Sequence, residues 1–223
     1  MLMAAALAGA VGCSRQEAPK AGAGTVGEAE TFKYLQEVGA IRTQVNADNR
    51  ERIPDLLSTL DSAQLGDEAA RIEGYRQSLA KLDVLQVDPG AVTFEQNFEH
   101  ILEAYKAVCL DSAELFRDAK KINDQHPGSE PIFLNSDGKI DLNRNDTSGA
   151  VDSLLAIVDN TPKASNDSGS SLDPALVDKV RGDLATLRKA KSAHHEFTET
   201  LKVNLAERFP GRDWTAKEIL PPK

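Results

Sequence analysis

The chain has 223 residues, of which 27% are charged, and a formal net charge of −9 at pH 7. This length suffices for one domain with a substantial core or for two small ones. The acidic balance argues against binding along nucleic acid, whose phosphates require Lys and Arg, and against flat adsorption to an anionic membrane.

The chain begins with an apolar run from Leu2 to Gly12, followed by Cys13. A helix that crosses a membrane needs about 20 apolar residues, so this run is too short to span one. A buried core helix is disfavoured, because Ala and Gly bury little area and no polar residues define an amphipathic face. An apolar run of this length that ends in small residues is typical of a secretory signal peptide.

The residues Ala10-Val11-Gly12-Cys13 resemble the lipobox of bacterial lipoprotein signal peptides. Val11 and Gly12 match the usual residues of that family, and Ala10 stands where Leu is commoner. The resemblance covers residues 1–13. It implies cleavage before Cys13, attachment of acyl chains such as palmitate to that cysteine, and therefore a membrane anchor. In the same family, Ser at the place of Ser14 favours the outer membrane, which implies a location on its periplasmic face.

An ordinary signal peptide with an incidental cysteine is the alternative. In either case residues 1–12 are expected to be a signal peptide. Residues 13–29 are rich in Gly, Ala, Ser and Pro and lack apolar periodicity, so they are expected to form a flexible tether.

Helical periodicity dominates the remaining chain, residues 30–223, and predicts one helical domain. Helices are expected over residues 28–47, 51–63, 67–83, 93–124 and 174–209. Pro54 is expected in the first turn of the second helix, Thr93 to Gln96 as a capping box, and Asp173 as an N-cap followed by Pro at the first helical position. The predicted fold is all-α, an antiparallel helical bundle with a small β-hairpin and loop insertion at about 129–172.

Within this insertion, residues 131–143 read as a β-hairpin, 149–160 as a short helix and 161–173 as a polar loop. The stretch from Asp141 to Asp152 resembles the calcium loops of EF-hand and dockerin-like families. Asp141, Asn143, Asn145 and Asp152 occupy loop places 1, 3, 5 and 12, where a hard cation finds oxygen ligands. Asp146, however, stands where those loops use Gly. The alternative is a polar turn in which Asp152 caps the following helix.

The remaining motifs give weaker evidence for a catalytic or metal site. Ser78 and Lys81 match S-x-x-K, but the further elements that such enzymes need are missing, so both are expected on an exposed helix face. His195 and Glu199 share a helix face without an evident third metal ligand, and His194 is expected in the core. Cys109 is expected to be a buried, inert thiol.

The sequence thus predicts a lipid-anchored envelope protein without catalytic residues, whose helical domain is structural or binds an envelope protein. No cofactor is expected apart from calcium at the loop described above. The alternative function is binding of a cation or small ligand by the 129–172 insertion.

Overall fold

The computed structural model describes residues 26–56, 61–127, 132–133, 172–216 and 219–220. These residues form four helices: α1 (Glu28–Leu56), α2 (Ser62–Leu79), α3 (Pro89–Gln125) and α5 (Pro174–Arg208). The described part contains no strand, so the all-α prediction is confirmed at that level. The predicted hairpin over 131–143 and the short helix over 149–160 lie outside the described residues, apart from residues 132–133.

An aspartate begins three of the helices. The side chain of Asp173 accepts a hydrogen bond from the N–H of Ala175 at 2.9 Å, with Pro174 at the first helical position, as predicted. Asp88 does the same for α3 through the N–H of Gly90 at 2.7 Å. An N-cap oxygen satisfies a backbone donor that the first turn of a helix leaves without a partner.

Three of the predicted helices differ from the structure in their bounds. The helix expected over 67–83 is observed as α2, Ser62–Leu79, because the side chain of Asp61 caps it five residues earlier. The expected helix over 93–124 begins at Pro89, because Asp88 and Pro89 supply a cap four residues earlier, and the Thr93 hydroxyl donates to the carbonyl of Pro89 at 2.9 Å. The helix expected over 28–47 continues to Leu56 as α1, so Pro54 lies near the end of a helix and not in a first turn. Of the helix expected over 51–63, residues 57–60 lie outside the described part of the chain and Ser62 begins α2.

The continuity of α1 across residues 47–51 has a visible cause. Asp48 and Asn49, which lie between the two expected helices, accept hydrogen bonds from the guanidinium of Arg71 on α2 at 2.8 and 2.9 Å. Tertiary contacts therefore stabilise a stretch of weak helix propensity.

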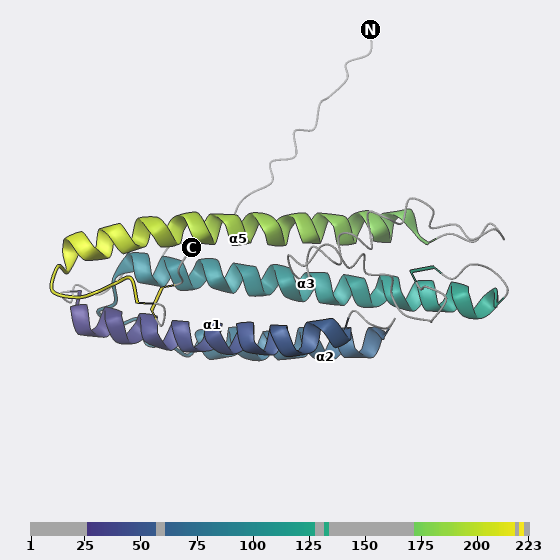
Figure 1. The fold of residues 1–223 in the computed structure, drawn as a ribbon, viewed down its shortest axis with the longest axis horizontal. Coiled ribbons are helices and arrows are strands. Elements are labelled where there is room, and N and C mark those ends of the chain that lie inside the picture. Colours follow the sequence, from purple (N-terminus) through teal and green to yellow (C-terminus); the bar gives the residue numbers. More distant parts are fainter. Residues whose placement is uncertain (1–25, 57–60, 128–131, 134–171, 217–218, 221–223) are drawn as a thin grey trace, which may run out of the picture.

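The helices lie side by side along one long axis, with α3 between α5 and the pair α1 and α2 (Figure 1). Contacts pair the start of α3 with the end of α5: Asp88 bonds to Arg208, whereas Asp111, further along α3, bonds to Lys179 near the start of α5. The two helices therefore run in opposite directions.

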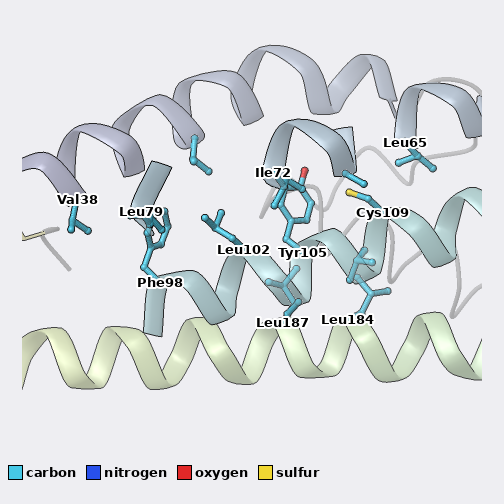
Figure 2. Close-up of a cluster of buried hydrophobic side chains, with 14 of the residues drawn as sticks. Val38, Leu65, Ile72, Leu79, Phe98, Leu102, Tyr105, Cys109, Leu184 and Leu187 are labelled. Carbon is cyan, nitrogen blue, oxygen red and sulfur yellow. The ribbon is translucent and has the colours of Figure 1, made fainter. Parts of the chain in front are cut away.

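The core is built mainly from the apolar stripe of α3 and from the residues of its neighbours that face it. Figure 2 shows Leu184 and Leu187 of α5 on one side of α3, and Ile72 and Leu79 of α2 on the other. Phe94, Phe116 and Leu115 of α3 are completely buried. Because α3 is contacted on both faces, it contributes more residues to the core than any other described helix.

One end of the bundle is closed by the segment that follows α5. Trp214, 1% exposed, packs against Phe32 and Phe209, each with its ring centre 5.8 Å from that of the tryptophan. Arg212 bonds to Glu28 at 2.8 Å, which joins this segment to the start of α1. Among the described helices, none is long and apolar enough to cross a membrane.

Candidate functional site

The residues predicted to carry function lie outside the described part of the chain. Cys13, the predicted lipid attachment site, precedes residue 26. Asp141, Asn143, Asn145 and Asp152, the predicted calcium ligands, fall between residues 133 and 172. Both predictions therefore remain predictions.

The most extensive polar cluster of the described residues surrounds Glu68 on α2. Its side chain is completely buried, and it accepts hydrogen bonds from two guanidinium nitrogens of Arg71, with the Nε–Oε2 distance 2.9 Å. The Tyr105 hydroxyl of α3 donates to Glu68 Oε1 at 3.4 Å, and Arg52 Nε of α1 lies 3.7 Å from Oε2. Glu68 thus has partners on three helices.

Arg71 connects Glu68 to polar residues of α1. It donates to Asp48 and Asn49, and Tyr75 also donates to the carboxylate of Asp48. Burial alone would lower the pKa of Arg71, but the hydrogen bond and the charge of Glu68 raise it well above its usual value. The hydrogen bond from Tyr75 holds the pKa of Asp48 below its usual range. Arg71 and Asp48 therefore both keep their charges at neutral pH.

Cys109 lies next to this cluster on α3 and is 2% exposed, as predicted (Figure 2). Burial, and secondarily the negative charge of Glu68, raise the pKa of its thiol far above the usual value. A thiol that stays protonated is a poor nucleophile and a poor metal ligand.

A second buried carboxyl, Glu95 of α3, faces Tyr34 of α1. Burial, followed by the charge of Glu99, raises the pKa of Glu95 to about 7, although its hydrogen bond with Tyr34 acts in the opposite direction. The pKa of Tyr34 is raised as well, first by burial and then by Glu95. Glu95 therefore changes its charge near neutral pH.

His194 of α5 packs onto the same part of the core. Its ring lies 4.6 Å from that of Phe94 and 6.0 Å from that of Phe98, measured between ring centres. Both ring nitrogens are buried without a hydrogen-bond partner. Burial, followed by the positive charge of Arg42, lowers the pKa of His194 to about 4, so the imidazole is neutral at physiological pH. Its predicted core position is confirmed.

A third polar group joins α3 to α5 near the other end of the bundle. Lys179 Nζ donates to Asp111 Oδ1 at 2.7 Å. Burial and the neighbouring Asp111 raise the pKa of Asp183 to about 6. Although burial alone would raise it, the hydrogen bonds from Asp183 and Lys179 hold the pKa of Asp111 below its usual range. The two carboxyls are thus kept in different protonation states over part of the acidic range.

The weaker motifs do not assemble into sites. The Ser78 hydroxyl donates to the carbonyl of Gly74 at 2.9 Å, an ordinary bond within a helix, and Lys81 is exposed. His195 is exposed on α5. In the described ranges no three His, Cys, Asp or Glu side chains are placed to hold a metal ion together.

The motifs did not indicate the buried acids Glu68 and Glu95, but the apolar periodicity of the sequence does. Glu68 falls on the apolar stripe marked by Leu65 and Ile72, and Glu95 falls on the stripe marked by Phe98 and Leu102. An acid at such a position must be buried and must find a partner.

In chemical terms the described clusters join helices, and their donors and acceptors face one another. No protein-family model, curated protein or solved structure matches this chain at a significant level.

Proposed function

We propose that this chain is a bacterial envelope lipoprotein, anchored through acyl chains on Cys13 at the periplasmic face of the outer membrane. Its helical domain has a structural or partner-binding role. The observation that carries the proposal is the lipobox-like stretch Ala10 to Cys13 directly after an apolar run too short to span a bilayer. The first described residue of the helical domain, Val26, follows only 13 residues later. The anchor would therefore hold the domain close to the membrane.

We further propose that the domain is an antiparallel helical bundle. Support comes from the order of the contacts between neighbouring helices. Along α2 and α3, Glu73 pairs with Lys106 and Arg76 pairs with Glu99, so the sequence numbers rise on one helix as they fall on the other. Long helices joined in this way form an elongated, stiff body, which suits a spacer or a docking platform in the envelope.

A non-catalytic role is supported by how the polar groups of the interior are used. Glu68 and Arg71 link α1, α2 and α3, and Lys179 and Asp111 link α3 and α5. A catalytic acid or nucleophile must face a space where a substrate can bind. These groups instead face one another between the helices.

The anchor can be tested in a diderm bacterium fed with an alkyne-bearing fatty acid. Wild-type protein should incorporate the label, pellet with membranes and require detergent for release, whereas Cys13→Ser should lose the label. Cys109→Ala is the matched control and should keep it, because Cys109 is buried in the core. Labelling of Cys13→Ser at the wild-type level would overturn the proposal.

Membrane choice is tested by Ser14→Asp. In lipoproteins, Asp at the place after the acylated cysteine favours retention in the inner membrane. Separation of the two membranes by density should therefore find wild-type protein with the outer membrane and Ser14→Asp with the inner one. An unchanged distribution would contradict the outer-membrane assignment and leave the acylation result standing.

A further inference from the structure

The connection between α2 and α3 places two adjacent apolar side chains in solvent. Val84 is 49% exposed and Leu85 is 66% exposed, which makes Leu85 the most exposed large apolar side chain of the described residues. Single exposed apolar residues are common on protein surfaces. Two consecutive exposed apolar residues are less common, and they suggest a contact surface when the backbone fixes both side chains outward.

The tip formed by Val84 and Leu85 is held in one shape by hydrogen bonds. The N–H of Leu85 donates to Asp83 Oδ1 at 2.9 Å, and the N–H of Val87 donates to the carbonyl of Val84 at 3.3 Å. Gln86 has a φ of 61°, in the left-handed region that side chains rarely adopt. The outward position of the tip is thus fixed by local structure.

This tip adjoins the point where the chain enters the helical domain. The N–H of Gly27 donates to the carbonyl of Gln86, next to Leu85, at 2.8 Å. Residues 14–26 connect Gly27 to Cys13, and a chain of this length reaches at most about 50 Å. The Val84–Leu85 tip and the start of α1 therefore lie at the same end of the bundle, the end nearest to Cys13 along the chain (Figure 1).

We propose that the Val84–Leu85 tip contacts the surface of the bilayer to which Cys13 is anchored, so that this end of the bundle faces the membrane. The proposal rests on the anchoring proposed above. Two apolar side chains bind a bilayer too weakly to recruit a free protein. An anchor converts the contact into an intramolecular one at high effective concentration, so a weak contact suffices.

Charge near the tip is consistent with a contact that depends on apolar side chains. The exposed Lys81 and Asp83 carry opposite charges in the same connection, and the chain as a whole has a net charge of −9. Anionic lipid would repel such a protein overall. A zwitterionic bilayer should therefore support the contact.

The test uses the full-length, mature, acylated protein in phosphatidylcholine vesicles that contain a doxyl-labelled lipid as a quencher. Leu85→Cys is labelled with the fluorophore NBD. The other two cysteines should not react with the dye, because the lipid attached to the sulfur of Cys13 blocks it and Cys109 is only 2% exposed. Leu110→Cys is the matched control, because Leu110 is also an exposed apolar residue, at 45%, but lies about 30 Å along α3 from its start. Circular dichroism verifies that both labelled proteins keep their helicity.

We expect the lipid quencher to reduce the emission at residue 85 at least twice as strongly as the emission at residue 110. Equal quenching at the two positions, with acylation of Cys13 verified by mass, would overturn the tip contact and leave the anchor intact. Protection of residue 85 in native envelopes but not in pure vesicles would also overturn it, in favour of a protein partner. A Cys13 without acyl chains would overturn both proposals.

Discussion

Replacement of His194 by leucine should stabilise the domain, and by more at acidic pH than at neutral pH. The imidazole is 7% exposed, lies against Phe94 and Phe98, and has no hydrogen-bond partner for either nitrogen. Leucine fills a similar volume without polar atoms. At pH 7.5 the gain should be about 1 kcal/mol, since an unsatisfied buried polar group costs about 1–3 kcal/mol.

The pH dependence follows from the pKa of His194, which falls from 6.5 in the unfolded chain to about 4 in the folded domain. Between these values the unfolded state binds a proton that the folded state does not, so acid favours unfolding. The stabilisation lost is about 1.4 kcal/mol for each unit of pKa difference, or about 3 kcal/mol over the whole window. This loss begins below pH 6.5 and is complete below pH 4.

Urea unfolding followed by circular dichroism, at pH values from 4.5 to 8, measures this difference. The free energy of unfolding of His194→Leu minus that of the wild type should grow by about 2 kcal/mol between pH 6.5 and pH 5. His195→Gln is the matched control, because His195 is exposed on the same helix and should leave the difference almost constant. Parallel curves for wild type and His194→Leu would refute the argument from burial.

Three further changes test other parts of the structure. Glu95→Gln should stabilise the domain by about 3 kcal/mol at pH 8 and by little at pH 5 in the same urea assay. The pKa of the carboxyl is raised from 4.5 to about 7 on folding, so the ionised acid costs stability above that range, whereas the amide stays neutral and can still accept from Tyr34. An equal effect at both pH values would contradict this. Arg71→Met should cost about 3–5 kcal/mol in thermal or urea unfolding, since the completely buried Glu68 loses both of its guanidinium hydrogen bonds and keeps only the more distant Arg52 as a cationic partner. Adding Glu68→Gln should recover much of the loss; a double variant no more stable than the single one would disprove the pairing. Millimolar Ca²⁺ should raise the melting temperature of the wild type but not that of Asp141→Ala, and identical shifts would reject the calcium loop.

The sequence predicted the long helices well because their apolar residues recur with helical spacing over many turns. The helix expected over 174–209 is observed as Pro174–Arg208, with the predicted cap at Asp173. The same Asp-Pro pair occurs at Asp88 and Pro89, four residues before the predicted capping box at Thr93. Both are local signals for the start of a helix, and the helix begins at the earlier one.

The polar clusters could be predicted only in part. Periodicity places Glu68 in the core, but it does not say which cation reaches it. Asp48 and Arg71 are 23 residues apart, and their pairing depends on how α1 and α2 lie against each other. The contact of Lys179 with Asp111 spans 68 residues. Such contacts are set by tertiary packing, which the periodicity of a single helix does not predict.

The closure of one end of the bundle has a mechanical consequence. Force applied to the chain before Gly27 meets three links at once: the bond from Gly27 to Gln86, the ion pair of Glu28 with Arg212, and the bond from the N–H of Asp88 to the Thr31 hydroxyl. These links attach α1 to the start of α3 and to the segment after α5. A pull at this end is therefore shared between several connections loaded in parallel, and the first turn of α1 separates from its neighbours only when all three are broken.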